Sequence, residues 1–219
     1  MFNNGTRMLR CTGLAIAVWL FLPAAEAGPI VDSGWDLFVT IPSQTRFMGQ
    51  YWMGVPIREY DFGGTVGVKD VGMADTIIHR PQAARVSAYG QSATIPIEII
   101  ALQLESVSAF DPDGDGPAGS AQYYITLAGP STGTATINFD HEPGTVPHGW
   151  FSSSFSVNWA LRAGGVDGPV LTTGTEGPFE LNLGYWNHEK TPPYGGVPLI
   201  PGVNYLLNGV DTTADFHLA

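Results

Sequence analysis

The stretch FSVNWALR, residues 155–162, decides the fold class. Its apolar and polar residues alternate strictly: Phe155, Val157, Trp159 and Leu161 are separated by Ser156, Asn158 and Ala160, and Arg162 follows. A period of two places the apolar side chains on one face of a β-strand and the polar ones on the other. We therefore expect a half-buried strand here, with Trp159 in the core.

Other stretches extend this pattern along the chain. TGTATINFD (132–140) and FELNL (179–183) alternate in the same way, whereas WDLFVTI (35–41) and TIPIEIIALQLESV (94–107) are more continuously apolar. A continuous apolar run is typical of a strand that is covered on both faces, so 94–107 is expected in the centre of a sheet. Its periodicity alone is also compatible with a short helix.

Glycine and proline punctuate these runs as turn signals. The chain has 28 Gly and 17 Pro, spread at strand–turn spacing. FGGT (62–65), AGGVDGP (163–169) and GTEGP (174–178) are predicted turns. Several short strands with regular turns favour an all-β fold, either a β-sandwich or a partly closed barrel, in one domain over residues 28–219.

The first 27 residues have the three parts of a secretory signal peptide. Arg7 and Arg10 are basic, Cys11–Leu22 is apolar, and AEA at 25–27 is an A-x-A cleavage site. The apolar run is shorter than the roughly 20 residues that a spanning helix needs. We expect cleavage before Gly28, no membrane insertion afterwards, and an extracellular or periplasmic location.

The net charge of the chain argues against two classes of binding partner. The chain has 9 basic and 20 acidic residues, which gives a net charge of −11. Nucleic acids and anionic membrane surfaces attract basic patches, so we expect neither as a partner. The only cysteine is Cys11, inside the predicted signal peptide, so the mature protein is expected to lack disulfides.

The loop DPDGDG (111–116) is a candidate calcium site. Asp111, Asp113 and Asp115 alternate as carboxylates do in the first half of an EF-hand loop. Gln122 stands where such a loop has its bidentate Glu, so an EF-hand is excluded. Two interpretations stay open: a simpler loop that binds calcium through these three carboxylates, and a solvated acidic turn.

Aromatic residues suggest a second kind of site. Trp52, Tyr185 and Trp186 lie near predicted turns, and exposed rings on a β-sheet stack well on sugar rings. This platform would bind glycans. The other interpretation, and the one that we favour, is ordinary burial of large rings under loops.

Catalytic and metal motifs are weak. The histidines are expected in exposed loops, since no HExxH pattern is present, and no G-x-S-x-G elbow surrounds Ser152–Ser154. Glu98 shares the even-numbered face of its predicted strand with apolar residues, but we expect it in water at the strand end. The histidines are His79, His141, His148, His188 and His217.

Three segments resemble a known group of proteins. GWDLFVT (34–40), GMADTIIHR (72–80) and TIPIEIIALQLESV (94–107) carry the patterns G-x-D-L-x-x-T, D-T-I-x-x-R and I-x-I-x-x-x-A-L-x-L-x-S. These patterns resemble a family of uncharacterised secreted bacterial β-rich proteins. GVNYLLNGVDTTADF (202–216) is similar to exported proteins that often carry a C-terminal sorting helix, which we do not expect here. The resemblance implies an exported β-rich protein and carries over no catalytic residue.

These observations together predict a secreted, non-enzymatic structural or adhesive interaction protein, stabilised by calcium if the acidic loop binds it. The first alternative is an extracellular carbohydrate-binding module. The second is a polysaccharide-acting hydrolase, which requires a pair of carboxylates across a sugar. Glycans and surface proteins are the expected classes of partner.

Overall fold

The structure is a computed structural model that describes residues 30–40, 45–47, 49–112, 121–140, 148–187, 196–204 and 215–217. Within these residues the chain forms β-strands and no α-helix, so the all-β prediction is confirmed. No helix in this described part is long and apolar enough to cross a membrane. The predicted signal peptide, residues 1–27, lies outside the described residues.

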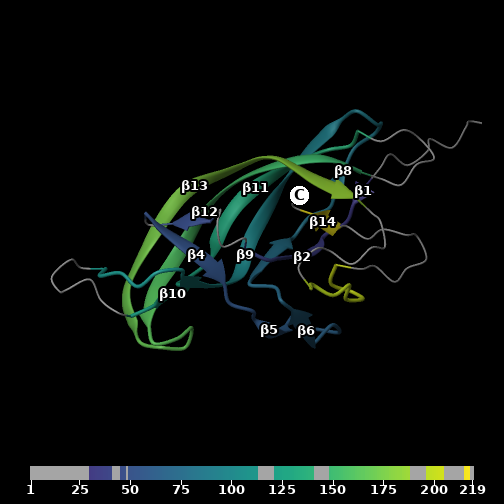
Figure 1. Ribbon diagram of the computed structural model, residues 1–219. Helices are drawn as coiled ribbons and strands as arrows, with labels where there is room; N and C mark the ends of the chain where they lie inside the picture. The colour runs from purple at the N-terminus through teal and green to yellow at the C-terminus, as the bar shows by residue number, and fades with distance from the viewer. Residues whose placement is uncertain are drawn as a thin grey trace, which may run out of the picture.

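The strands differ widely in length, and the longest three, β9, β12 and β13, form the body of the sheet (Figure 1). The strands are β1 Ile30–Val31, β2 Gly34–Phe38, β3 Arg46–Phe47, β4 Gln50–Gly54, β5 Arg58–Asp61, β6 Val68–Gly72, β7 Thr76–Arg80, β8 Ala84–Arg85, β9 Ser92–Ser106, β10 Tyr123–Leu127, β11 Ser131–Asn138, β12 His148–Ala163, β13 Val170–Asn187 and β14 Asp215–His217.

Strands β10 and β11 lie end to end between β9 and β12, and all of these pairings are antiparallel. The break between them falls opposite Asn158 of β12. The carbonyl of Asn158 accepts a hydrogen bond from the Ala128 amide at 2.9 Å, and its own amide donates to the Ser131 hydroxyl at 2.8 Å. Asn158 therefore satisfies backbone and side-chain groups where the ladder is interrupted.

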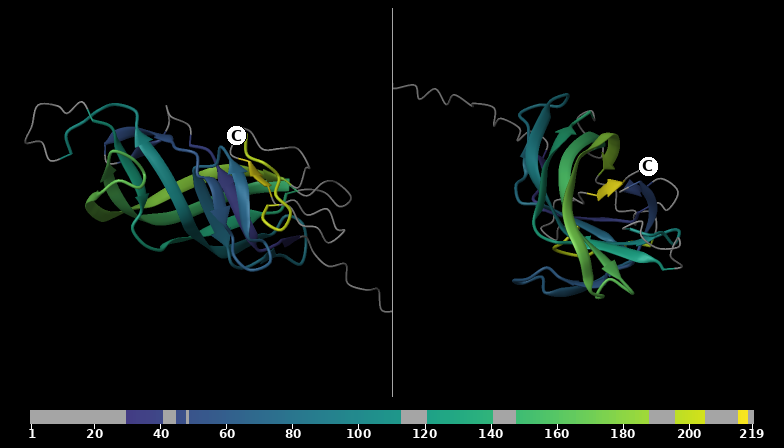
Figure 2. Two further views of the ribbon diagram at one scale, coloured as in Figure 1. Left: turned by 90° about the horizontal axis from the view of Figure 1, so that it is seen from below. Right: turned by 90° about the vertical axis from the view of Figure 1, so that its left-hand side faces the viewer.

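The sheet curls until its two edges meet. β7 and β4 pair with the free edge of β9, β2 and β3 extend them, and β13 and β14 extend the opposite side beyond β12. Phe47 of β3 stacks on Phe179 of β13 with ring centroids 5.7 Å apart, so side chains bridge the edges. Figure 2 shows the resulting curvature, which is that of a partly closed barrel.

The inner face of this curved sheet holds two apolar clusters. The predicted strand 155–162 lies within β12, and its residues Val157, Trp159 and Leu161 are buried as expected. One cluster contains Phe47, Trp52, Ile99, Leu104, Ile125, Val157, Trp159 and Leu161. The other contains Val31, Ala84, Ile95, Ile97, Ala135, Ile137, Phe139, Phe151 and Trp186.

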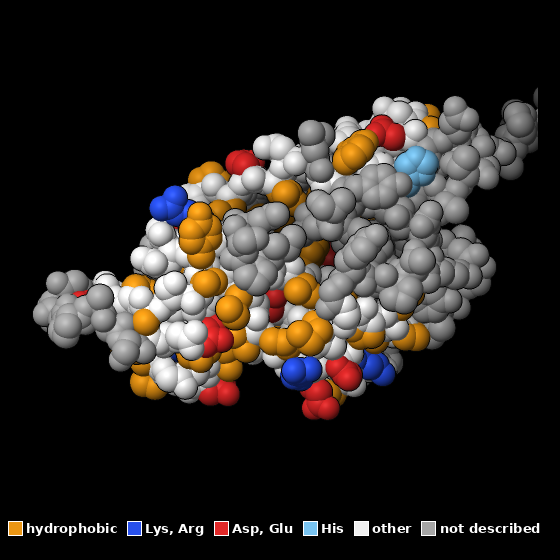
Figure 3. Space-filling view, in the orientation of Figure 1, with side chains coloured by type: hydrophobic (Ala, Val, Ile, Leu, Met, Phe, Trp, Pro, Cys, Tyr) orange, Lys and Arg blue, Asp and Glu red, His pale blue; other side chains and the backbone are white. Residues whose placement is uncertain are grey.

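A third cluster lies on the outer face, where the β5–β6 hairpin and residues 196–204 cover β2, β7 and β9. Leu37, Ile77 and Val203 are buried there, together with Val71, Ala74, Val197 and Ile200. Strand β9 is therefore covered on both faces, as its continuous apolar run predicts. Figure 3 shows Lys, Arg, Asp and Glu side chains gathered on the outside of the β5–β6 hairpin.

Glycines within the strands make room for large aromatic rings on the neighbouring strand. In four register pairs a glycine faces an aromatic residue, and an added Cβ would come within 3.0 Å of that side chain. The predicted turn at 174–178 is therefore wrong: Gly174 lies inside β13 because the indole of Trp159 lies over it. The pairs are Gly133–Phe155, Gly149–Trp186, Gly174–Trp159 and Gly184–Phe151.

Gly184→Ala tests this arrangement. A Cβ at position 184 would lie 2.3 Å from Cε1 of Phe151, so the ring must move within a close-packed core. We expect a loss of about 1–3 kcal/mol in the free energy of unfolding, measured by urea denaturation. Gly129→Ala is the matched control, since a Cβ there meets nothing within 4 Å. Equal stability of the two variants would contradict the packing.

Candidate functional site

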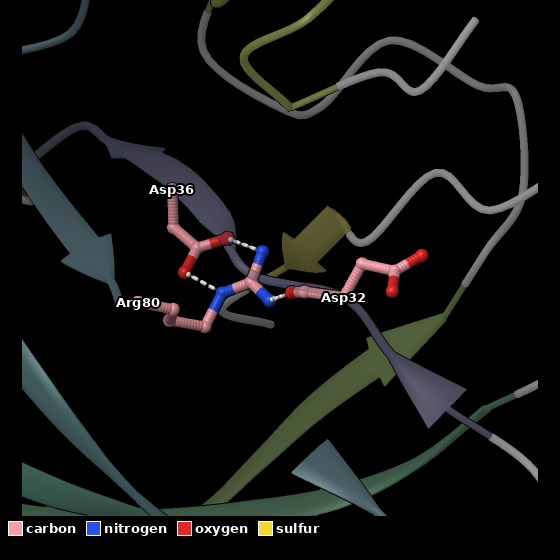
Figure 4. Close-up of polar contacts among 3 residues, drawn as sticks. All are labelled: Asp32, Asp36 and Arg80. Atoms are coloured by element: carbon pink, nitrogen blue, oxygen red, sulfur yellow. Dashed lines mark hydrogen bonds and ion pairs between the residues drawn. The ribbon is translucent and has the colours of Figure 1, made fainter. Parts of the chain in front are cut away.

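Two of the three patterned segments form the neighbouring strands β2 and β7, and they are joined by a buried ion pair. Arg80 Nε donates to Asp36 Oδ2 at 2.7 Å and Arg80 Nη2 donates to Asp36 Oδ1 at 3.1 Å. Arg80 Nη1 donates to the carbonyl of Asp32 (Figure 4). The two side chains are only 2% and 5% exposed. This is the forked geometry in which a guanidinium holds a carboxylate most firmly.

The surroundings of this ion pair show why its charges are unfavourable to bury and why it selects one pairing of β2 with β7. Burial raises the pKa of Asp36, and the guanidinium of Arg80 opposes part of that rise. A Cβ on Gly34 would lie 3.4 Å from Arg80 Nη2, so glycine leaves the guanidinium room beside β2. The pair therefore fixes which residues of β2 and β7 face each other, because either partner alone would be a buried charge.

A second buried carboxylate joins the opposite ends of the same two segments. Asp75 Oδ2 accepts from the Thr40 amide at 2.6 Å, and Asp75 Oδ1 accepts from the hydroxyls of Thr40 and Thr76 at 2.8 and 2.7 Å. The side chain lies over Gly54, where a Cβ would be 1.7 Å from Asp75 Oδ2. Burial raises the pKa of Asp75, and the three hydrogen bonds oppose it.

The polar residues of the two patterns therefore have structural roles. In each segment one acidic residue meets a partner from the other segment: Asp36 meets Arg80, and Asp75 meets Thr40. Ser106, at the end of the third pattern, is also buried and accepts a hydrogen bond from the Tyr123 amide at 3.0 Å. These contacts hold strands together.

His79 and Glu98 lie differently from the expectation. His79 is not in a loop: it lies in β7, half-buried, with its ring stacked on Trp35 at 5.3 Å. Glu98 is not at a strand end: it lies in the middle of β9, half-buried and opposite His79 in register. Burial, followed by the charges of Glu98 and Asp61, raises the pKa of Tyr60 on the covering hairpin.

The calcium loop stays a prediction. Asp111 is half-buried at the end of the described segment 49–112, whereas Asp113 and Asp115 lie outside the described residues. His141 and His188 lie outside them as well. Where the structure is described, no group of three or more His, Cys, Asp or Glu side chains converges on a point that would hold a metal ion.

The candidate platform of Trp52, Tyr185 and Trp186 is wrong for its two indoles, and the favoured burial of these rings is confirmed for both. Trp52 is 0% exposed and Trp186 is 1% exposed, and they lie in different clusters of the inner face. Each indole N–H is used inside the protein, by the carbonyl of Phe47 at 2.8 Å and by that of Asn138 at 3.0 Å. Tyr185 lies in β13, but its side chain is outside what the structure describes. Residues 185 and 186 are consecutive in a strand, so they cannot share one face.

Among the described tryptophans Trp150 is the exposed one, and the sequence pattern did not single it out. It lies near the start of β12, pairs with Tyr185 in register, and is 44% exposed. It precedes the strictly alternating stretch by five residues, where Gly149 and Ser152 weaken the pattern. The signal that places it outside is its neighbour Phe151, which belongs to the inner face.

The outer face beside Trp150 is hydroxyl-rich and ordered by hydrogen bonds between strands. Thr94 and Thr136 lie 2.9 Å apart through their hydroxyls, and Ser154 donates to Glu180 at 2.7 Å. Asn138, next to Trp150 across the β11–β12 pair, donates from its amide to the Trp150 carbonyl at 3.3 Å. We call the surface formed by Trp150, Asn138, Thr136, Ser152 and Ser154 the outer hydroxyl face.

Comparisons with protein-family models, with curated proteins and with solved structures found no match to this chain.

Asp36→Asn should destabilise the protein strongly. The variant leaves the guanidinium of Arg80 buried without its counter-charge, which typically costs about 3–5 kcal/mol. Denaturant unfolding measures the loss. Asp32→Asn is the control, because its carboxylate is partly exposed and reaches Arg85 only at 4.0 Å. We expect a change of at most about 1 kcal/mol for the control. A small effect of Asp36→Asn would show that the pair does not fix the strands.

Asp75→Asn should change how stability depends on pH. Because burial raises the pKa of Asp75 in the folded protein, its contribution is fully present below the unfolded pKa and is lost as pH rises through the folded pKa. The difference in unfolding free energy between wild type and variant should therefore fall as pH rises from about 4. Urea unfolding across this range measures it. A difference that falls on acidification instead would contradict a raised pKa.

Proposed function

We propose that the protein is a secreted interaction protein of adhesive or structural type, whose binding surface is the outer hydroxyl face. The observation that carries this proposal is the exposure of Trp150, at 44%, in contrast to the burial of Trp52, Trp159 and Trp186. Exposing a large apolar ring to water is unfavourable in the isolated protein. Covering the ring with a partner removes this unfavourable hydration and so favours binding.

The setting of the ring supports a binding role. Tryptophan is enriched among the residues that dominate binding energy. A rim of neutral hydroxyl and amide groups supplies hydrogen bonds without the free-energy cost of removing water from a charged group. Thr136, Ser152 and Asn138 provide such a rim within one strand of Trp150. The charged residues of the β5–β6 hairpin lie elsewhere on the molecule, over the third cluster (Figure 3).

We also propose that the protein is exported and that it belongs with the secreted β-rich proteins that it resembles. The features of residues 1–27 support secretion, and the three patterned segments support a place among the secreted β-rich proteins that they resemble. Because the polar residues of those segments hold strands together, the resemblance supports a common framework and leaves the partner to be set by exposed residues such as Trp150.

A carbohydrate-binding module is the second candidate, and the composition of the outer hydroxyl face favours it. One flat apolar ring with neutral hydroxyl and amide groups on one side of it matches a pyranose, which has an apolar face and a rim of hydroxyls. This proposal replaces the buried indoles of Trp52 and Trp186 with Trp150 as the stacking residue.

Trp150→Ala tests both candidates on a panel of immobilised polysaccharides and extracellular proteins. Truncating a residue that dominates binding typically costs about 2 kcal/mol or more, so we expect affinity to fall by about 30-fold or more. Tyr51→Ala is the control, since Tyr51 is 52% exposed on β4. Unchanged binding of Trp150→Ala would refute the assignment of the surface. A protein as the captured partner would favour the first candidate over the carbohydrate.

A further inference from the structure

Strand β13 has an open edge over its first part, residues 170–176. Of the described strands, β12 pairs with β13 along one side, whereas β14 pairs with the other side only at residues 185–187 (Figure 1). Phe47 covers the strand further along, where its ring stacks on Phe179 at 5.7 Å. In an antiparallel pair, alternate residues direct their backbone N–H and C=O groups away from the partner strand. Within the described part of the chain, these groups of residues 170–176 therefore face no neighbouring strand.

Other edges of the structure are covered or charged, and this one is neither. The Trp35 amide of β2 donates to the Val203 carbonyl at 3.4 Å, which covers the edge of β2. Strand β5, with the sequence REYD, carries exposed charges. Lysine, proline and other charged residues are the usual means by which soluble proteins prevent their exposed edges from pairing. Residues 170–175, VLTTGT, contain no charged residue and no proline.

The side chains along this edge are exposed. Val170 and Leu171 are 47% and 50% exposed, and Thr172, Thr173 and Thr175 are exposed as well. Valine and threonine are β-branched, and such residues favour strands. An uncharged edge with β-branched and aliphatic side chains is the kind of surface to which another strand adds. The edge is therefore suited to pairing with a neutral, extended strand.

Two irregularities in the β12–β13 pairing limit the length of this edge. The register shifts next to Leu161 and again next to Val157. Pro178 lies just beyond the second shift, and it has no N–H to donate to an added strand. The regular stretch between the shifts, 172–176, is short. An added strand would therefore bury an area in the low range, which is typical of weak and reversible interfaces.

We propose that two copies of the protein pair through this edge, β13 against β13, as an antiparallel dimer whose two-fold axis passes beside Thr173. Thr173 is the middle residue of 170–176. A two-fold axis perpendicular to the sheet keeps the inner faces of both copies on one side, and residue 173 then faces itself while Leu171 faces Thr175. The same edge is used by both copies, so the pairing closes as a dimer and covers both open edges.

Charge favours a second copy as the occupant. Each copy has a net charge of −11, so two copies repel each other wherever acidic residues come together. In the pairing centred on Thr173, Glu176 faces Val170 of the other copy, and residues 170–175 bring no carboxylate to the interface. A charged peptide finds no counter-charge along this segment, whereas a second copy offers a strand that is neutral and has the same open edge. The interface does not depend on the function proposed for the outer hydroxyl face.

Sedimentation velocity of the whole protein over about 1 µM to 1 mM tests the proposal. We expect a dimer with a Kd inside this range, and tighter association at higher salt because salt screens the repulsion between two acidic copies. Thr173→Lys should weaken the association by about 10-fold or more, since it places two like charges opposite each other. Thr134→Lys is the matched control and should leave the association unchanged, because Thr134 is exposed on β11, which pairs with β9 and β12 on its two sides.

A disulfide locates the axis. Directly opposed residues of antiparallel strands have Cα atoms about 4.5–5.5 Å apart, which a disulfide can span. In a chain that carries Cys11→Ser, Thr173→Cys supplies the only thiol. Mild oxidation should then join two copies, whereas Thr134→Cys in the same background should stay mostly monomeric.

Three results would overturn the proposal. The first is a wild-type protein that stays monomeric at about 1 mM in both low and high salt, which needs no variant to fold. The second is a dimer that Thr173→Lys weakens no more than Thr134→Lys does. The third is equal disulfide formation by the two cysteine variants, which would place the contact between copies elsewhere. A monomeric wild type that captures an extended peptide at β13 would also replace the second copy by a different occupant.

Discussion

The buried bidentate contact between Asp36 and Arg80 is the interaction on which the first half of the fold depends. It joins residues 44 positions apart and fixes the facing of β2 and β7 at one end, while Asp75 and Thr40 fix it at the other. Strand β7 pairs with β9, and β9 lies between the two inner clusters and the outer one. A one-residue slip of β2 would exchange its two faces, so this contact also determines which residues reach the third cluster.

This arrangement changes how the patterned segments should be understood. A run of Asp, Thr and Arg invites a catalytic or metal-binding interpretation, because these side chains serve both purposes. In this protein they satisfy one another inside the sheet, with Asp75 accepting three hydrogen bonds. Their burial makes them a framework, whereas Trp150, which we propose for recognition, is exposed outside it.

Local pattern predicted the local structure well. The alternation over 155–162 predicted a half-buried strand, and the continuous apolar run at 94–107 predicted a strand covered on both faces. Pairing between distant segments was beyond such reasoning, since a period of two does not say which strand lies alongside. The contacts of Asp36, Asp75 and His79 all come from such pairing, and they were missed for that reason.

A turn signal and two candidate platform residues both gave way to the packing of the sheet. Gly174 looked like a turn signal, yet it lies in a strand because Trp159 needs the space above it. Trp52 and Trp186 lie beside predicted turns, and they are buried, as the favoured interpretation had it, because the small barrel needs large side chains to fill its interior. In both cases the packing against other strands determines where the residue lies. The sequence of one strand alone does not show which residues it will pack against.

Hydrogen exchange followed by mass spectrometry tests whether the Asp36–Arg80 pair holds β2 and β7 in the sheet, with wild type and Asp36→Asn compared under conditions where both are folded. If the ion pair holds the first half of the sheet together, exchange will accelerate in β2, β7 and the β5–β6 hairpin, while β12 and β13 keep their protection. Unchanged protection of β2 and β7, or an equal loss across all strands, would show that the ion pair does not have this role.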